Sequence, residues 1–157
     1  MPNFKAPINS KGAWLGLALS LVAAWEGLYT HAYKDSVGVT TICYGVTNVD
    51  RGVQMGDKVT ADQCKKWLAE DLPRYDAEVQ KCVHVDMPPH RHAAIVSFTY
   101  NVGSGALCKS SVARYLNEGK VQEGCDALLL YNRGGGQYIK GLDNRRHAER
   151  EWCLRSD

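Results

Sequence analysis

The sequence carries little net charge, and such a weak charge argues against a nucleic-acid partner. Its 157 residues include 19 Lys and Arg and 17 Asp and Glu, which leaves a formal charge of +2 at pH 7. The basic residues are scattered apart from Arg145-Arg146, and no basic stretch is interleaved with aromatic side chains. We therefore expect no nucleic-acid binding, and only a mild attraction to an anionic cell wall or membrane surface.

Metal and cofactor motifs are missing as well. The cysteines form no C-x-x-C pair. Gly134-Gly135-Gly136 lacks the strand-to-helix context of a phosphate loop. The five histidines form no recognisable zinc-ligand set: His31, His84, His90, His92 and His147. We therefore expect neither a metal site nor a cofactor.

The strongly apolar run is too short to span a bilayer. Ala13 to Trp25 has 13 residues, whereas a transmembrane helix needs roughly 20. The run follows a loose basic leader at residues 1–12 and fits the hydrophobic part of an export signal. Cleavage after Ala24 would remove the helix before Glu26, so we expect none. Two interpretations stay open: a core helix of a soluble protein, or an anchor that associates transiently with the inner membrane through residues 13–25.

Two carboxylates lie on either side of a change in local structure. Glu26 ends the apolar run, and Gly27 is a suitable C-terminal cap for a helix. The stretch from Tyr33 to Tyr44 is rich in strand formers and predicts a short β-hairpin or a small sheet. Because the helix breaks after Glu26, the chain can fold back and bring Asp35 to face it.

The surroundings of these two acids favour different protonation states. Apolar neighbours are expected to crowd Glu26 and to disfavour its ionised form, so that it can donate a proton. Asp35 lies in a polar turn and is expected to stay ionised, and Thr41 can help it to hold a water molecule. Hydrolysis of a glycosidic bond needs such an acid and base. The alternative is that Glu26 is a solvated helix end and Asp35 belongs only to a turn.

Several further motifs follow in order along the chain. They run from Glu26-Gly27-Leu28 through Ala32-Tyr33-Lys34-Asp35, Gly38, Thr40-Thr41-Ile42-Cys43-Tyr44-Gly45, Tyr100-Asn101-Val102-Gly103-Ser104-Gly105 and Gly134-Gly135-Gly136 to Gly141-Leu142-Asp143-Asn144-Arg145-Arg146 with Glu149. This series resembles the phage-type lysozymes, the endolysins of glycoside hydrolase family 24, from about Ala24 to Leu154. Val46 departs from the pattern, because many relatives carry His or Glu there.

The resemblance implies an α+β, lysozyme-like fold that is mostly helical, with a small β-hairpin lobe at the active site. It implies a single domain over residues 1–157, with a substrate cleft between two lobes. The expected parts are a leader with the apolar helix (1–25), a small active-site lobe (26–59), and a connector helix with a helical lobe (60–157). Some relatives carry an uncleaved signal-anchor that later leaves the membrane, and Ala13 to Trp25 resembles a short version of it.

The resemblance also implies the chemistry. The protein would be a glycosidase that hydrolyses the β-1,4 bond between N-acetylmuramic acid and N-acetylglucosamine in peptidoglycan. Glu26 would be the general acid, and Asp35 with Thr41 would position the attacking water. Matching positions imply three substrate-binding residues: Tyr100, Asn101 and Arg145. For these, a core tyrosine, a capping asparagine and a surface arginine remain as alternatives, and Arg145 could also pair with Glu26.

Two other functions stay open. A lytic transglycosylase cuts the same bond with one acid and would not need Asp35. A wall-binding or membrane-active module without catalysis would act through the apolar segment. We expect a monomer that is made in the host cytoplasm and acts in the periplasm on glycan strands.

Helical spacing and caps predict the remaining elements. Thr60 and Gln63 form a capping box that begins a long helix from about Ala61 to Lys81. Gly103-Ser104-Gly105 is expected to stop a central helix. Further helices are expected at 90–102, 110–116, 121–131 and 143–154, the last capped by Asp143, with a polar loop at 49–58.

Six cysteines in a chain of this size point to an oxidising compartment. Of the fifteen connectivities that six cysteines allow, we favour the sequential one because each bridge would link neighbouring elements of the expected fold. A thiol nucleophile at Cys43 is less favoured, since no histidine lies beside it. The expected pairs are Cys43 with Cys64, Cys82 with Cys108, and Cys125 with Cys153.

Overall fold

The computed structural model describes residues 12–155, so the basic leader lies, apart from Gly12, outside the described residues. The chain forms two compact units, and the divisions between them fall inside helices α1 and α3. We call Leu19–Asp71 the sheet unit. The helical unit comprises the chain up to Ala18 and from Leu72 onwards. The single-domain organisation and its lobe borders stay a prediction.

Helix α1 (Ala13–Glu26) is formed by the apolar run and ends at Glu26, as expected. Its buried side chains include Leu21 and Val22. Gly27 has a φ of +72°, a left-handed conformation that glycine adopts readily and that ends the helix. Among residues 12–155, no helix is both long enough and apolar enough to cross a membrane.

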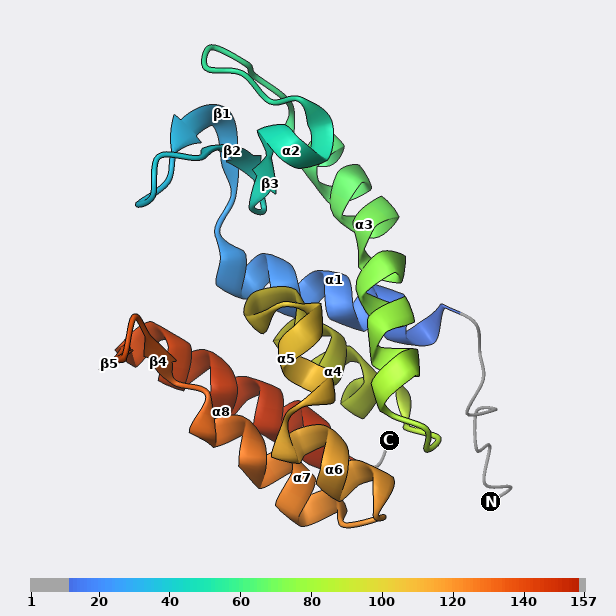
Figure 1. Cartoon of the computed structure of the whole chain (residues 1–157). Coiled ribbons are helices and arrows are strands. Elements are labelled where there is room, and N and C mark those ends of the chain that lie inside the picture. Colours follow the sequence, from blue (N-terminus) through green and yellow to red (C-terminus); the bar gives the residue numbers. More distant parts are fainter. Residues whose placement is uncertain (1–11, 156–157) are drawn as a thin grey trace. The chain divides into compact units, whose positions relative to one another are not determined.

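A three-stranded antiparallel sheet follows α1. The strands run in the order β1 (Tyr29–Lys34), β2 (Thr40–Cys43) and β3 (Val46–Thr47) (Figure 1). All four residues of β2 are buried, which suits its composition of Thr-Thr-Ile-Cys. The predicted small sheet is therefore confirmed, although its first strand begins at Tyr29 instead of Tyr33.

The prediction of a polar loop at 49–58 is partly wrong, because helix α2 (Asn48–Arg51) occupies its start. Thr47 caps this helix: its side chain accepts a hydrogen bond from the Asp50 N–H, and the Asp50 carboxylate accepts one from the Thr47 N–H. Gly52 then ends the helix with a φ of 65°. The capping pattern forms α2 although none of its residues is buried.

Helix α3 (Ala61–Cys82) confirms the long helix predicted from about Ala61 to Lys81. The Gln63 N–H donates to Thr60 Oγ1 at 3.1 Å, which is one half of the predicted capping box. Pro73 lies inside this helix. The buried face follows the predicted helical spacing and includes Cys64, Leu68, Leu72 and Val79.

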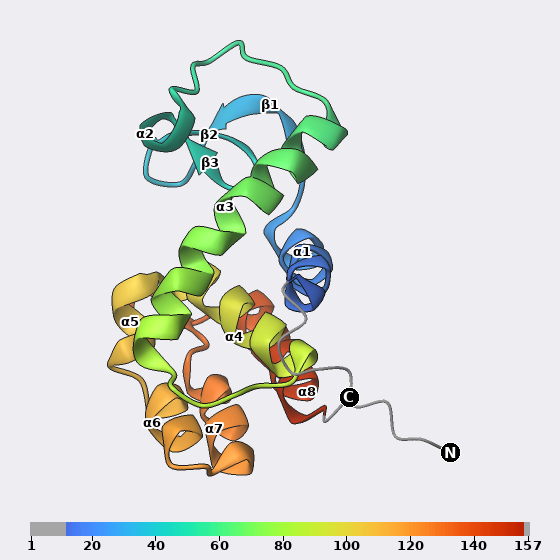
Figure 2. The ribbon, with the colours of Figure 1, turned by 90° about the vertical axis from the view of Figure 1, so that its right-hand side faces the viewer.

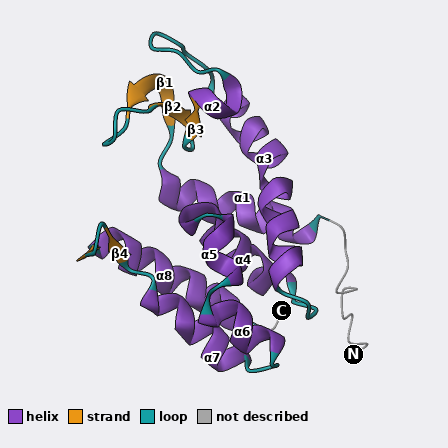
Figure 3. Ribbon diagram, in the orientation of Figure 1, coloured by secondary structure: helices purple, strands orange, loops and turns teal. Residues whose placement is uncertain are grey.

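Helices dominate the helical unit (Figure 3). Its central helix, α4 (Pro89–Val102), has seven consecutive buried residues, 93–99. Helix α8 packs against α4, and α6 packs against α7 (Figure 2). The elements after α4 are α5 (Ser104–Cys108), α6 (Ser111–Asn117), α7 (Val121–Ala127), the 3-10 helix η1 (Leu128–Leu130), β4 (Arg133–Gly134), β5 (Gln137–Tyr138) and α8 (Lys140–Leu154).

Three boundaries in the helical unit differ from the predictions. Gly103 alone, with a φ of +89°, ends α4, and Ser104 already begins α5. The helix expected over 121–131 tightens into η1 after Ala127. Helix α8 begins at Lys140, so Asp143 lies within its first turn and does not cap it. Instead, the Asp143 carboxylate accepts hydrogen bonds from Asn132 Nδ2 at 3.2 Å and from the Tyr138 hydroxyl at 3.0 Å.

Gly135 and Gly136 form the turn of a small hairpin that was not among the predicted elements, and Gly134 is the last residue of its first strand. Strand β4 pairs with β5 in antiparallel register. Gly135 and Gly136, between the strands, both have positive φ, at 57° and 79°. Two successive positive φ values are typical of a type I′ turn, which glycine adopts without strain.

All six cysteines form disulfides in the sequential connectivity favoured from the sequence. Each bridge lies within one of the two units. The pairs are Cys43–Cys64 in the sheet unit, and Cys82–Cys108 and Cys125–Cys153 in the helical unit.

Candidate active site

The three predicted catalytic residues all belong to the sheet unit. Glu26 is the last residue of α1, Asp35 follows the end of β1, and Thr41 lies in β2 (Figure 1). Because the helix breaks at Gly27, one carboxylate lies at the end of a helix and the other at the end of a strand, as the sequence predicted.

Backbone hydrogen bonds hold the Asp35 carboxylate. Oδ1 accepts from the N–H of Val37 at 2.9 Å and from the N–H of Val39 at 2.8 Å. The Asp35 N–H in turn donates to the Val39 carbonyl at 2.9 Å. Two N–H donors on one oxygen fix the orientation of this carboxylate. Both bonds are made by Oδ1, so Oδ2 is the oxygen oriented to accept a proton from a ligand or a water molecule.

Thr41 is attached to the same backbone segment. Its hydroxyl donates to the Val39 carbonyl at 3.0 Å, and its side chain is buried in the sheet. Because the hydroxyl proton is used in this bond, the lone pairs of Oγ1 are oriented to accept a hydrogen bond. Val39 thus connects Asp35 and Thr41 through main-chain atoms.

Tyr33 is a site residue that the sequence analysis did not single out. It lies opposite Thr41 across the β1–β2 pair, so the two side chains share one face of the sheet. Burial raises the pKa of the Tyr33 phenol above its ordinary value of about 10, and repulsion from Tyr29, Asp35 and Glu26 adds to this rise. The negative charges of both carboxylates therefore raise the pKa of the same phenol. The signal in the sequence was the position of Tyr33 in the strand segment that leads to Asp35.

Glu26 is only half-buried. Its sequence neighbours Trp25 and Leu28 are 37% and 42% exposed. The apolar crowding expected around this carboxyl is thus not supplied by the residues next to it in the sequence. What brings Glu26 to the site is its position at the last turn of α1.

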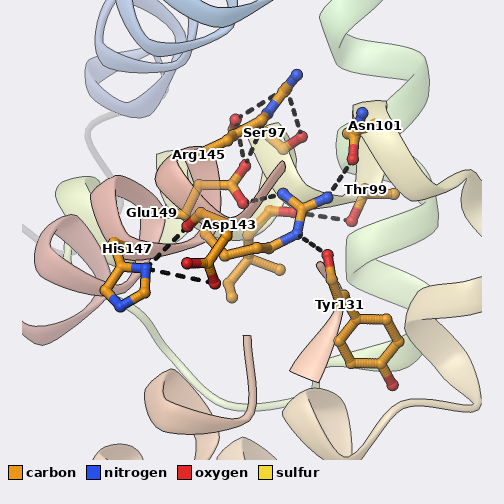
Figure 4. A network of polar contacts seen from close by, with 10 residues as sticks. Ser97, Thr99, Asn101, Tyr131, Asp143, Arg145, His147 and Glu149 are labelled. Carbon is orange, nitrogen blue, oxygen red and sulfur yellow. Dashed lines mark hydrogen bonds and ion pairs between the residues drawn. The ribbon is translucent and has the colours of Figure 1, made fainter. Parts of the chain in front are cut away.

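The three predicted substrate-binding residues belong to the helical unit. Arg145 is buried, so the surface-arginine alternative is wrong. It donates to Glu149 at 3.3 Å, to the Ser97 carbonyl at 3.1 Å and to the Ser97 hydroxyl at 3.2 Å (Figure 4). A pairing with Glu26 and a contact with substrate stay predictions.

Asn101 joins the same network through Arg146. The Arg146 guanidinium donates to Asn101 Oδ1, to Glu149 and, at 2.9 Å, to the Tyr131 carbonyl. Glu149, fully buried, is the anion that compensates both arginines near the start of α8. Its spacing of three and four residues from them was the sequence signal for this pairing.

Asn101 and Arg146 also line a cavity of about 410 Å³ in the helical unit. Tyr100 is half-buried, and its ring packs on Tyr75 with the ring centroids 4.7 Å apart. The other residues that line the cavity are Val102, Leu130, Tyr131, Arg133 and Leu142.

Comparisons with known proteins agree on one family. The family model described as phage lysozyme matches residues 23–149. A SAR-endolysin of Pseudomonas phage phiKMV is 41% identical over 149 residues, which covers 92% of this chain and 90% of that protein.

Solved structures show a lysozyme-like fold. A P22 lysozyme mutant superposes with a TM-score of 0.81 and 31% identity, covering 88% of this chain and 96% of that one. The muramidase domain of SpmX from Asticaccaulis excentricus also gives 0.81, with 30% identity over 88% of this chain and 95% of that one. These matches confirm the expected α+β lysozyme-like fold. The chain belongs to the phage lysozyme family.

Proposed function

We propose that this protein is an endolysin that hydrolyses the β-1,4 bond between N-acetylmuramic acid and N-acetylglucosamine, and so lyses the host cell for phage release. Membership of the phage lysozyme family makes it a cell-wall-degrading enzyme. The choice of this bond rests on the family. One observation supports the mechanism: the Val39 backbone holds both the Asp35 carboxylate and the Thr41 hydroxyl, which orients an acid and a hydroxyl together in the sheet unit.

In the proposed mechanism, Glu26 donates a proton to the glycosidic oxygen while a water molecule attacks the anomeric carbon. Asp35 accepts a proton from this water, using the oxygen that the backbone does not hold. Thr41 Oγ1 accepts a hydrogen bond from the other O–H of this water and so orients the molecule. Attack by water from the opposite face predicts inversion of configuration, which requires carboxyl groups about 6.5 to 9.5 Å apart.

The helical unit is proposed to hold the glycan strand through Tyr100, Asn101 and Arg145. Asn101 is exposed and carries an amide that suits sugar hydroxyls. For delivery, we propose that the protein is made in the host cytoplasm, reaches the periplasm and associates transiently with the inner membrane through residues 13–25. The name SAR-endolysin of the phiKMV relative supports an exported protein.

The test is mass spectrometry of the fragments that the oxidised protein releases from purified peptidoglycan. We expect fragments with one added water and a reducing muramic acid end. Glu26→Gln is expected to release none while keeping its helical circular dichroism. Anhydro ends would identify a lytic transglycosylase, and binding without fragments would identify a wall-binding module; either result would overturn the proposal.

A further inference from the structure

An exposed pair of tyrosine rings lies along β1. The ring centroids of Tyr29 and Tyr33 are 4.3 Å apart, and the ring planes are inclined by 37°. Tyr29 is 48% exposed, whereas Tyr33 is half-buried. The outer ring therefore presents its surface to solvent and is supported from beneath by the inner one.

The pair extends from one proposed catalytic acid to the other. At one end, a ring carbon of Tyr29 lies 3.5 Å from the place that a Cβ on Gly27 would take, so this ring lies against the residue after Glu26. At the other end, Tyr33 lies opposite Thr41 and two residues before Asp35. The repulsion that both carboxylates exert on the Tyr33 phenol agrees with this placement.

A flat aromatic surface of this kind suits the apolar C–H face of a sugar ring, and the tyrosine hydroxyls can remain in water. We propose that Tyr29 and Tyr33 form a stacking platform that binds one sugar ring of the glycan strand beside the bond to be cut. This inference rests on the proposed function and deepens it. Tyr29 makes the contact, and Tyr33 supports it.

A lipid surface is the competing occupant, because Trp25 and Leu28, which precede Tyr29 closely in the sequence, are also exposed. The charges favour the sugar. The Asp35 carboxylate lies two residues after the inner ring, and its negative charge would be repelled by anionic lipid headgroups. A neutral sugar hydroxyl can instead donate a hydrogen bond to this carboxylate.

The test measures binding of a peptide-free hexasaccharide of alternating N-acetylglucosamine and N-acetylmuramic acid by calorimetry. All variants are made in the full-length Glu26→Gln chain, so that the ligand is not cut. Tyr29→Ala and Tyr29→Leu are expected to weaken binding by about tenfold, whereas Tyr29→Phe keeps most of the affinity. Met55→Ala is the matched control, because Met55 is 55% exposed in the same unit.

Equal hexasaccharide affinity for Tyr29→Ala and its parent would overturn the platform, and so would full affinity for Tyr29→Leu, which keeps apolar bulk without a ring. Loss of binding to anionic phospholipid vesicles, with unchanged hexasaccharide affinity, would assign this face to the membrane and also overturn it. Fragment release by the wild-type chain is measured separately. The two measurements therefore distinguish a failure of the platform, seen as unchanged hexasaccharide affinity, from a failure of the proposed hydrolysis, seen as absent fragment release.

Discussion

Val39 holds two members of the proposed catalytic set with its backbone alone. Its N–H donates to Asp35 Oδ1, and its carbonyl accepts from the Thr41 hydroxyl and from the Asp35 N–H. The carboxylate and the hydroxyl are therefore oriented by one peptide segment just before β2. Because the contacts are main-chain contacts, the identity of the Val39 side chain does not determine them.

The Thr41 hydroxyl is expected to matter for rate and not for folding. Thr41→Val keeps the shape of a β-branched side chain in a buried strand but removes the oxygen that orients water. We expect fragment release to fall by about 100-fold, while Thr41→Ser retains most activity. Thermal unfolding of both variants serves as the control. Wild-type rates in Thr41→Val would remove Thr41 from the mechanism.

The Tyr33 phenol reports the charge of both acids. Burial is the main cause of its raised pKa and persists in variants, but the repulsion from Asp35 and Glu26 can be removed. A neutral neighbour repels the phenolate less, so Asp35→Asn and Glu26→Gln should each lower the Tyr33 pKa. Carbon-13 NMR titration of labelled tyrosine measures this shift. An unchanged pKa in both variants would separate Tyr33 from the two acids.

Glu149 is a residue on which the stability of the helical unit depends. Its carboxylate is fully buried and pairs with both Arg145 and Arg146. Glu149→Gln leaves two buried guanidinium groups without their anion, which we expect to lower the free energy of unfolding by about 3 to 5 kcal/mol. Urea denaturation measures the loss. Glu151→Gln, exposed on the same helix, should change it by less than about 0.5 kcal/mol.

At the scale of single elements, helix α2 is stabilised by the capping interactions at its ends and by side-chain contacts with α3. Arg51 at its last turn pairs with Glu70 and Asp71, at 3.1 and 2.8 Å, and its guanidinium lies over the Trp67 ring. None of the residues of α2 is buried, so apolar packing does not explain why it forms. Helix α2 forms because of the cap at Thr47 and Asp50 and because of the contacts that Arg51 makes with α3.

Removal of the cap should therefore destabilise the sheet unit. Asp50→Ala deletes the acceptor for the Thr47 N–H and hydroxyl, at an expected cost of about 0.5 to 2 kcal/mol in the free energy of unfolding. Val49→Ala is the control in the same helix, since Val49 is 88% exposed. Equal unfolding midpoints for the two variants would contradict the role of the cap.

The long elements could be predicted because a single local signal repeats over many residues. Helix α3 shows a periodic apolar face, and α1 is apolar until Gly27 breaks it. Short elements such as α5, η1 and the β4–β5 hairpin carry no such repetition. Their form depends on single glycines and on the surrounding chain.

The candidate site likewise has a part that the sequence predicts and a part that it does not. The types and order of Glu26, Asp35 and Thr41 are sequence features, so the motif identifies them. The part played by Val39 consists of main-chain bonds, which no residue type encodes. The role of Tyr33 depends on strand register, and a register shift between Tyr29 and Tyr33 prevents its exact prediction from alternation alone.

At the scale of the whole molecule, the disulfides are expected to stabilise the two units separately. Cys43–Cys64 connects β2 to α3 within the sheet unit, and the other two bridges lie in the helical unit. The paired substitution Cys43→Ala with Cys64→Ala should destabilise the sheet unit by about 2 to 4 kcal/mol. Hydrogen exchange resolved by peptide should show faster exchange in residues 40–47 than in 93–99. Uniform loss of protection would contradict independent stabilisation.

The order of the disulfides also bears on how the chain can be oxidised. Each cysteine pairs with its neighbour in sequence, across separations of only 21, 26 and 28 residues. If such a chain is threaded N-terminus first into an oxidising compartment, the next cysteine to emerge is always the correct partner for an unpaired one. Oxidation in order of emergence would then produce the native bridges directly, without an isomerase to exchange wrong pairs.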